Sequence, residues 1–261
     1  KLMINKGTDA TYMDVAANDT VTVTGTLYLT NGYMGSSGGT LTNDSCSVNH
    51  NAGFDGGDYG TLINITGGSG TITMPESAII PALTLNAANC TLSLSGTATT
   101  TFDSQLTLTS GTILANDAAV DIDGNAGNST GYTQSGGTYT GRSGADNFDK
   151  NFTVSGGTFT SGGGRMMNAA SSAFSLSGTG IVDWSAADRV DLDTGTFVMS
   201  AGTFVATSNT MYSANSQWDI TGGTFHHSSG TIEFDGNQVT QTDVNTSLTL
   251  AHVTLNRTSS W

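Results

Sequence analysis

The sequence predicts an all-β protein, a right-handed parallel β-helix (β-solenoid) of about ten or eleven rungs, where a rung is one coil of 20–26 residues. Two observations carry this prediction. An eight-residue phrase occurs five times between residues 132 and 225, with copies 20–23 residues apart, and apolar residues alternate with polar ones inside each copy. A period near 20 that tolerates length changes is typical of solenoids. Crossovers between parallel strands are nearly always right-handed, which sets the expected hand of the coil.

The phrase itself reads as a strand, a bend and a second strand. In Phe152-Thr-Val-Ser-Gly-Gly-Thr-Phe159 the first and third residues are apolar, so they point to one face of a strand. The glycines that follow permit a bend at low steric cost. The other clear copies begin at Tyr132, Phe174, Phe197 and Trp218, and weaker copies begin at Val21, Leu41, Ile63, Leu83, Leu106 and Leu248.

Stacking of the rungs, at ~4.8 Å per rung, predicts two continuous interior columns of side chains. The first column is expected to contain Leu83, Leu106, Tyr132, Phe152, Phe174, Phe197 and Trp218. The second is expected to contain Ile113, Tyr139, Phe159, Ile181, Phe204 and Phe225. Neither strand of a single rung can bury its apolar face alone, so the core exists only in the stack.

The chain is expected to form a single elongated domain. Residues 1–20 are predicted to be an N-terminal cap or an irregular first rung, residues 21–239 the regular rungs, and residues 240–261 the last rung and C-terminal end. That end carries Val253, Leu255 and Trp261 with little charge nearby, so we expect it to continue into more chain or to contact a neighbouring copy.

Charge and composition exclude several classes of function. The formal net charge is -14 with only 7 basic residues, which argues against nucleic-acid binding. No apolar run approaches the ~20 residues of a membrane helix, so no membrane insertion is expected. Only 11% of residues are charged, and threonine, serine, asparagine and glycine are abundant, which favours an extracellular location.

The two cysteines, Cys46 and Cys90, are predicted not to be bonded to each other. In the expected register they lie two rungs apart, a distance of ~10 Å. A disulfide tolerates a Cα separation of only ~7 Å.

Several of the repeated phrases resemble those of known proteins. Ser155-Gly-Gly-Thr-Phe-Thr160, Thr221-Gly-Gly-Thr-Phe225 and Ser229-Gly-Thr-Ile-Glu-Phe-Asp-Gly-Asn237 are similar to repeats of large secreted bacterial and archaeal surface proteins of the parallel β-helix adhesin type. The resemblance extends over most of residues 21–256. It implies an extracellular stalk, adhesin or filament component, with self-association or a surface glycan as partners, and it implies no catalytic residue.

The outward positions of the phrase are rich in threonine, which makes them candidates for a ligand-binding or surface face. The candidates are Thr22, Thr24, Thr84, Thr107, Thr109, Thr133 and Thr153. Such arrays resemble the ice-binding face of solenoid antifreeze proteins, so ice binding is one alternative function. Threonine also simply suits an exposed strand, which is the other interpretation of the same pattern.

The segment around Asp121 has the oxygen-rich spacing of a calcium loop. Asp121, Asp123 and Asn125 could bind a cation together with Asp149 from the next rung, making Ca²⁺ the one cofactor to consider. Ala126 and Tyr132 occupy the positions where an EF-hand requires glycine and glutamate, so that motif is excluded. Solvated turn aspartates are the alternative interpretation.

A carbohydrate-active β-helix enzyme is the remaining alternative. Its candidate residues are Asp183, Asp188, Arg189, Asp191 and Asp193, since paired carboxylates ~5–9 Å apart can act as acid and base. Acidic turns are common, however, and His226-His227 reads as a surface pair at a strand end. The sequence therefore favours a non-enzymatic, extracellular structural or adhesive solenoid with no catalytic residue.

Overall fold

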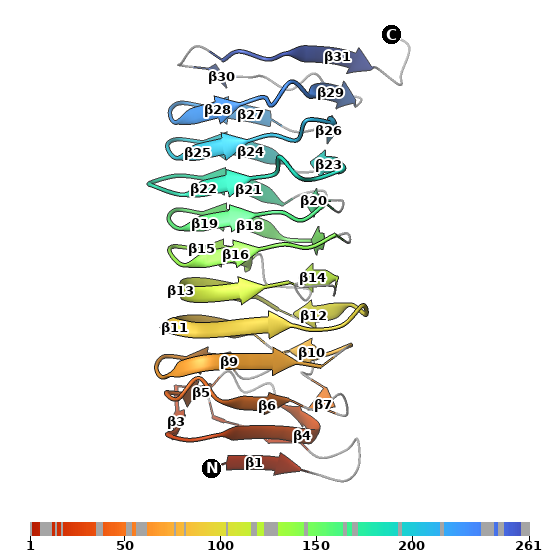
Figure 1. Cartoon of the computed structure of the whole chain (residues 1–261). Coiled ribbons are helices and arrows are strands. Elements are labelled where there is room, and N and C mark those ends of the chain that lie inside the picture. The colour runs from red at the N-terminus through yellow and green to blue at the C-terminus, as the bar shows by residue number, and fades with distance from the viewer. Residues whose placement is uncertain are drawn as a thin grey trace.

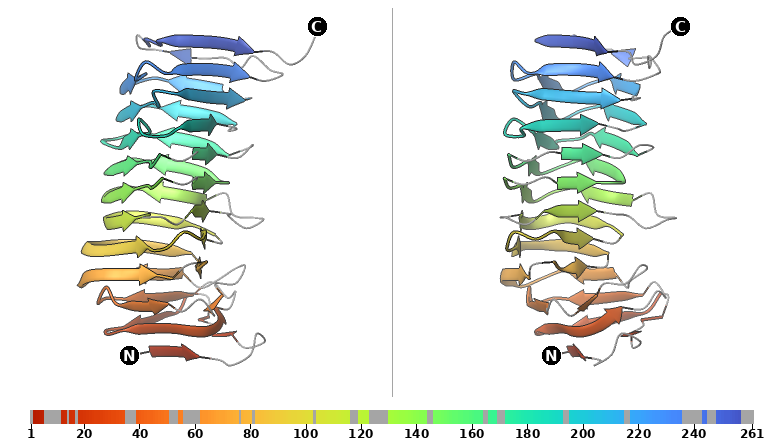
Figure 2. Two further views of the ribbon diagram at one scale, coloured as in Figure 1. Left: turned by 45° about the vertical axis from the view of Figure 1, so that its right-hand side comes forward. Right: turned by 90° about the vertical axis from the view of Figure 1, so that its right-hand side faces the viewer.

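The computed structural model is a single stack of parallel strands, and none of the residues that it describes is helical (Figure 1). It describes residues 2–5, 12–13, 15–16, 18–34, 39–50, 54–55, 62–75, 77–80, 82–102, 104–115, 119–122, 130–143, 146–163, 166–168, 172–192, 195–214, 217–235, 243–244 and 248–256. Turned views show the rungs stacked along one long axis, with the termini at opposite ends (Figure 2). The predicted parallel β-solenoid is therefore confirmed.

Each complete rung contributes one strand segment to each of three sides. The first side holds β3 (Thr20–Val23), β5 (Thr40–Asn43), β8 (Leu62–Ile65), the first parts of β11 (Leu83–Leu94) and β13 (Leu106–Leu114), β15 (Thr130–Gln134), β18 (Asn151–Val154), β21 (Ala173–Leu176), β24 (Thr196–Met199), β27 (Gln217–Ile220) and β30 (Asp243–Val244).

The second side follows the bend of each rung. It holds β1 (Leu2–Asn5), β4 (Leu27–Met34), β6 (Val48–His50), β9 (Ser69–Met74), the last parts of β11 and β13, β16 (Thr138–Thr140), β19 (Thr158–Thr160), β22 (Ile181–Asp183), β25 (Thr203–Val205) and β28 (Thr224–His226).

The third side is a nine-stranded sheet of β10 (Ile79–Ile80), β12 (Thr100–Phe102), β14 (Val120–Ile122), β17 (Asp146–Phe148), β20 (Met166–Asn168), β23 (Arg189–Leu192), β26 (Thr210–Ala214), β29 (Thr231–Asp235) and β31 (His252–Asn256). At the N-terminal end β2 (Tyr12–Met13) and β7 (Phe54–Asp55) pair with the end of β4. The third side has nine strands, whereas the first side has eleven. The stack therefore has about nine complete turns, slightly fewer than the ten or eleven rungs expected.

The first interior column lies where the sequence predicts it. All seven predicted members are at most 1% exposed, and strand pairing places them in one register. Their rings stack, with centroids 5.4 Å apart for Phe152 and Phe174 and 4.6 Å apart for Phe174 and Phe197. Stacked or edge-on aromatic pairs contribute ~0.5–1.5 kcal/mol beyond the burial of their area, so this column stabilises the contact between successive rungs.

The second column differs from the prediction at one rung. Ile181 is 38% exposed and pairs with Thr158, whereas Val182 is buried and pairs with Phe159. The distance along the chain from Phe174 to Val182 is one residue longer than from Phe152 to Phe159, because the bend at Gly178–Gly180 contains an extra residue. A shift of one residue turns every side chain of a strand to the opposite face, so the prediction of Ile181 in the core is wrong.

The bend between the first and second sides explains the paired glycines of the phrase. Gly157 has φ +75°, a left-handed conformation that other residues rarely adopt. A Cβ atom added there would lie 2.4 Å from the carbonyl oxygen of Gly137 in the adjacent rung. Glycine is therefore required both by the backbone conformation and by the close approach of two stacked bends.

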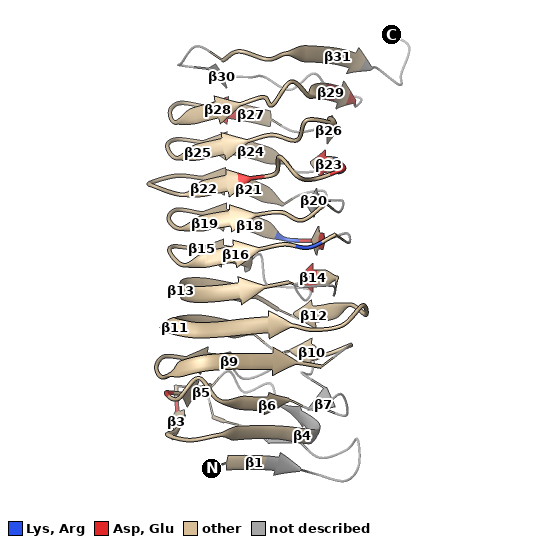
Figure 3. Cartoon of the chain, in the orientation of Figure 1, with Lys and Arg blue, Asp and Glu red and all other residues tan. Residues whose placement is uncertain are grey.

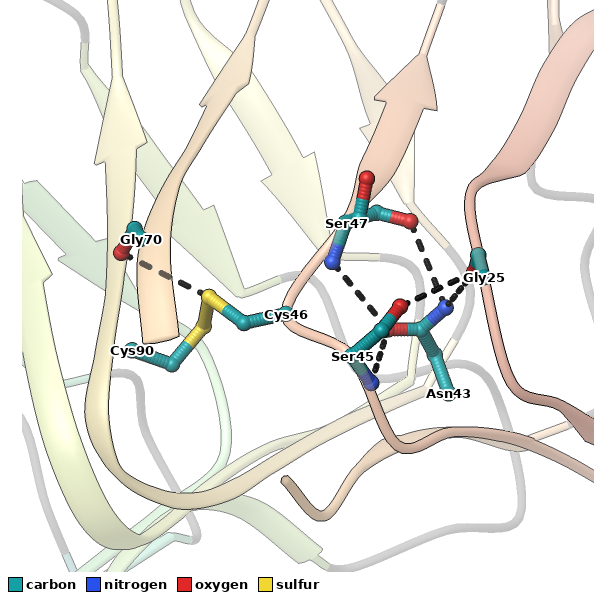
Figure 4. Close-up of a disulfide and its surroundings, with 7 residues drawn as sticks. All are labelled: Gly25, Asn43, Ser45, Cys46, Ser47, Gly70 and Cys90. Atoms are coloured by element: carbon teal, nitrogen blue, oxygen red, sulfur yellow. Dashed lines mark hydrogen bonds between the residues drawn. A yellow bond between two sulfur atoms is a disulfide. The ribbon is translucent and has the colours of Figure 1, made fainter. Parts of the chain in front are cut away.

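Two polar side chains occupy the interior third position of the phrase. Asn43, which made its copy look weak, is fully buried: its Nδ2 donates to the carbonyl oxygens of Gly25 and Ser47, at 2.9 and 3.3 Å (Figure 4). Gln134, also fully buried, donates through Nε2 to the carbonyl oxygens of Gly137 and Thr158. Because buried polar groups are stable only when they are hydrogen-bonded, both residues serve to tie bends together.

Cys46 and Cys90 form a disulfide, with their Cα atoms 5.7 Å apart, so the prediction that they are not bonded is wrong (Figure 4). The prediction assumed straight stacking across two rungs. Cys46 lies in the bend between β5 and β6 with φ +50°, and Cys90 lies in the irregular middle of β11, where the pairing with β13 shifts register, so neither cysteine follows straight stacking. Cys90 lies opposite Gly70 of the intervening rung, which has no side chain to separate the two sulfur atoms.

Candidate functional site

The predicted outward threonines of the first side form an aligned column. Strand pairing stacks Thr22, Thr42, Asn64, Thr84, Thr107, Thr133, Thr153, Ser175, Val198 and Asp219 one above another. Thr24 and Thr109, two residues further along their rungs, are exposed. The arrangement brings five of the seven candidate threonines into one column, which Asn64, Val198 and Asp219 interrupt, and leaves Thr24 and Thr109 outside it.

The candidate calcium site lies only partly in the described residues. Asp123 and Asn125 are outside them. Asp121 faces outward on β14, where its Oδ1 accepts a hydrogen bond of 3.1 Å from Nδ2 of Asn147 in the next rung. Asp149 is partly exposed, and its backbone N–H donates to the carbonyl oxygen of Ile122. Within the described ranges, no group of three or more His, Cys, Asp or Glu residues could hold a metal ion.

The acidic cluster considered for catalysis is divided between two sides of the coil. Asp183 ends β22, and its Oδ1 accepts a 2.9 Å hydrogen bond from the backbone N–H of Ser185. Asp191, on β23, is only 4% exposed and forms a bidentate pair with Arg189, with contacts of 2.8–3.1 Å. These two carboxylates support a turn and an ion pair.

The other charged members of that cluster are distributed in the same way. The Arg189 guanidinium also lies 4.1 Å from the ring centroid of Tyr212, a cation–π contact between neighbouring rungs. Asp188 is exposed, and Asp193 lies outside the described residues. His226 is exposed, and Nδ1 of His227 accepts a hydrogen bond from the backbone N–H of Ser229.

A buried charged group that the sequence analysis missed lies at the bend into the third side. Asp146 is 1% exposed; its Oδ1 accepts a hydrogen bond from the N–H of Val120 and lies 3.6 Å from Nε of Arg142, whose side chain is 6% exposed. Burial raises the pKa of the Asp146 carboxyl to about 6, although Arg142 acts in the opposite direction. No sequence spacing marks such a site, because Arg142 and Asp146 meet only when the bend closes.

The adjacent Tyr139 belongs to the second interior column. It is fully buried, and burial, followed by the effect of the Asp146 carboxylate, raises the pKa of its hydroxyl well above the ordinary value. A fully buried tyrosine beside a carboxylate and a guanidinium makes this rung more polar inside than its neighbours. We interpret the group as part of the core, since none of its members is exposed to solvent.

The sequence analysis also missed a second and more regular threonine array, on the second side. The residues before and after each interior residue of the second column point outward. The first of these outward columns contains Thr71, Thr91, Thr112, Thr138, Thr158, Ile181, Thr203 and Thr224. The signal is present in the phrase, since threonine precedes the last aromatic residue in four of its five clear copies, but threonine is common in strands and does not by itself mark a surface.

No helix in the described part of the chain is long and apolar enough to cross a membrane. Comparisons with protein-family models, with curated proteins and with solved structures found no match to this chain.

Proposed function

We propose that this chain is a non-enzymatic extracellular β-solenoid that serves as a surface stalk, an adhesin or a filament subunit. The observation that carries the proposal is the uniform stack: successive rungs repeat the same three sides, and the outward columns of the first and second sides consist mainly of threonine and serine. Such an architecture spaces and displays surfaces along a rod.

The disulfide supports an extracellular location. Disulfides persist in oxidising environments such as cell surfaces and are rare in reducing compartments. Here the Cys46–Cys90 bridge joins rungs near the N-terminal end of the stack, where β1, β4 and β6 lie. A covalent link between these rungs would resist their separation.

The exposed edge of β31 fits contact with a further copy or with more chain. Strand β31 pairs with β29, and among the described residues it has no partner on its other edge. Its side chains Val253 and Leu255 are 49% and 80% exposed, and Met3 on β1 at the opposite end is 49% exposed. Unpaired strand edges with apolar side chains favour end-to-end contacts, and a heterologous contact of this type extends into a filament.

The location is tested by immunogold electron microscopy of intact cells of the source organism, with antibodies raised against the purified chain. The proposal predicts gold particles along projections or over the outer surface, while an antibody to a cytosolic marker leaves intact cells unlabelled. Labelling that appears only after the cells are opened would contradict the extracellular assignment.

A further inference from the structure

The second side presents two outward columns of side chains, the first of which is almost entirely threonine. We define the threonine face as the outward residues of β9, β16, β19, β25, β28, the last parts of β11 and β13, and β22. Its first column has threonine at every rung except Ile181. Its second column contains Thr73, Ser93, Leu114, Thr140, Thr160, Asp183, Val205 and His226.

The geometry of this face follows from its strands. Rungs repeat at ~4.8 Å, and residues two apart in a strand repeat at ~6.6 Å. Hydroxyl and methyl groups therefore recur along the first column, and they recur in both directions at β9, β16 and β19, where both outward residues are threonine. Eight strands give a length of roughly 34 Å. The members of the first column are all partly or fully exposed, with Thr71, Thr138 and Thr224 among the exposed ones. The first column is therefore regular and accessible along the rod, whereas Ser93 of the second column is buried.

The face is nearly free of charge, although the molecule carries a formal net charge of -14. In Figure 3 its strands are drawn without blue, and red occurs only on β22, where Asp183 is the single acidic residue of the two columns. An uncharged face on an acidic molecule selects against ionic ligands. It offers nothing to phosphates, and no cation to an anionic membrane.

The residue types also argue against a protein partner. Binding energy in protein interfaces is concentrated in buried tryptophan, tyrosine and arginine anchors, and none of these residue types occurs in the two columns. A strip ~34 Å long and two residues wide is also small beside the ~800 Å² that each partner of a stable complex normally buries.

We propose that the threonine face binds ice. Each threonine contributes one hydroxyl, which donates one and accepts two hydrogen bonds, and one methyl group. Each contact with ordered water is weak, so a useful affinity requires a ligand that repeats with the face and engages many threonines at once. Crystalline water is an uncharged ligand that is periodic in two dimensions, whereas liquid water offers no such register.

The rung of β22 interrupts the array and provides an internal test. Ile181 and Asp183 replace the threonine pair that Thr158 and Thr160 present one rung earlier. The charge of Asp183 and the bulk of Ile181 divide the face into a long part, from β9 to β19, and a short part of β25 and β28. We therefore expect Ile181→Thr combined with Asp183→Thr to increase ice binding by joining the two parts.

The experiment measures thermal hysteresis and inhibition of ice recrystallisation for the full chain with its disulfide intact. The wild type is expected to shape ice crystals and to hold back their growth. Thr138→Lys with Thr158→Lys should abolish both activities. The matched control, Thr133→Lys with Thr153→Lys, places the same charges on the first side of the same two rungs and should leave both activities unchanged.

Circular dichroism melting of each variant verifies that it is folded before activity is compared. Absence of any ice activity in the wild type would overturn the proposal. Loss of activity in the control pair but not in the Thr138 and Thr158 pair would assign ice binding to the first side and overturn this choice of face. Sedimentation of the wild type with crystalline cellulose or chitin, without ice activity, would identify a polysaccharide ligand instead. None of these outcomes bears on the extracellular location, which the immunogold labelling tests separately.

Discussion

Replacing Phe174 by alanine should destabilise the solenoid by about 3–5 kcal/mol, the usual cost of truncating a buried phenylalanine. The magnitude follows from its surroundings. Phe174 is fully buried, stacks on Phe152 and Phe197, and meets Trp184 and Phe204 edge-on at centroid distances of 5.5 and 5.6 Å. Alanine would leave a cavity between the rings of Phe152 and Phe197, which belong to the rungs on either side of Phe174. Those two rungs cannot move together to fill the cavity, because the backbone pairing with the rung of Phe174 holds them apart.

The assay is guanidinium-induced unfolding followed by tryptophan fluorescence, because Trp184 lies beside the cavity. The matched control is Phe225→Ala, which truncates a ring that is only partly buried at the C-terminal end of the second column. It should cost about 1–2 kcal/mol, since less apolar surface is lost. A midpoint for Phe174→Ala equal to that of the wild type, or a larger loss for the control, would refute the register of the core. Phe174→Asp should prevent folding altogether, because it buries an unpaired charge.

Three further predictions concern pH, the disulfide and association. The pKa of Asp146 is about 6 in the folded chain against an ordinary 3.8, so the free energy of unfolding is highest below pH ~4 and falls by about 3 kcal/mol as pH rises through 6. Asp146→Asn should remove this dependence of the unfolding midpoint on pH, measured between pH 4 and 8. Non-reducing peptide mapping should recover a peptide linking Cys46 and Cys90, and Cys46→Ser with Cys90→Ser should cost about 4 kcal/mol for a loop of this length, whereas unchanged stability would contradict the bridge. Leu255→Lys should reduce concentration-dependent association in sedimentation velocity; if the wild type remains monomeric at high concentration, end-to-end assembly is wrong.

The fold could be predicted because the same pattern occurs in every rung. The alternation of apolar and polar residues that places Phe174 inside is present in many copies, so one irregular copy does not obscure it. The same logic failed at Ile181, where one extra residue in a bend shifts the strand to the other face. Asn43 occupies a position where the phrase normally has an apolar residue. Its side chain is hydrogen-bonded to carbonyl groups of the bends, and these contacts cannot be predicted from the sequence.

The candidate sites were less predictable, because they depend on irregular rungs. The disulfide forms because Cys46 and Cys90 lie in bends, whose positions do not follow the spacing of the rungs, and meet beside Gly70 of the intervening rung. The Asp146 and Arg142 pair forms across a bend and lacks a motif. The threonine face was hidden for a different reason. Threonine has a high strand propensity, so its presence in a strand carries little information until pairing shows that the threonines are stacked in one column.

The claim on which everything else depends is that the rungs stack in parallel and in register, and distances between spin labels along one column test it directly. With ~4.8 Å per rung, labels at Thr42 and Thr153, five rungs apart, should give a distance of about 24 Å, and so should labels at Thr107 and Asp219. Labels at Thr42 and Asp219, eight rungs apart, should give about 38 Å. Unequal values for the first two pairs, or a third distance that does not grow in proportion to the number of rungs, would contradict the stacked solenoid.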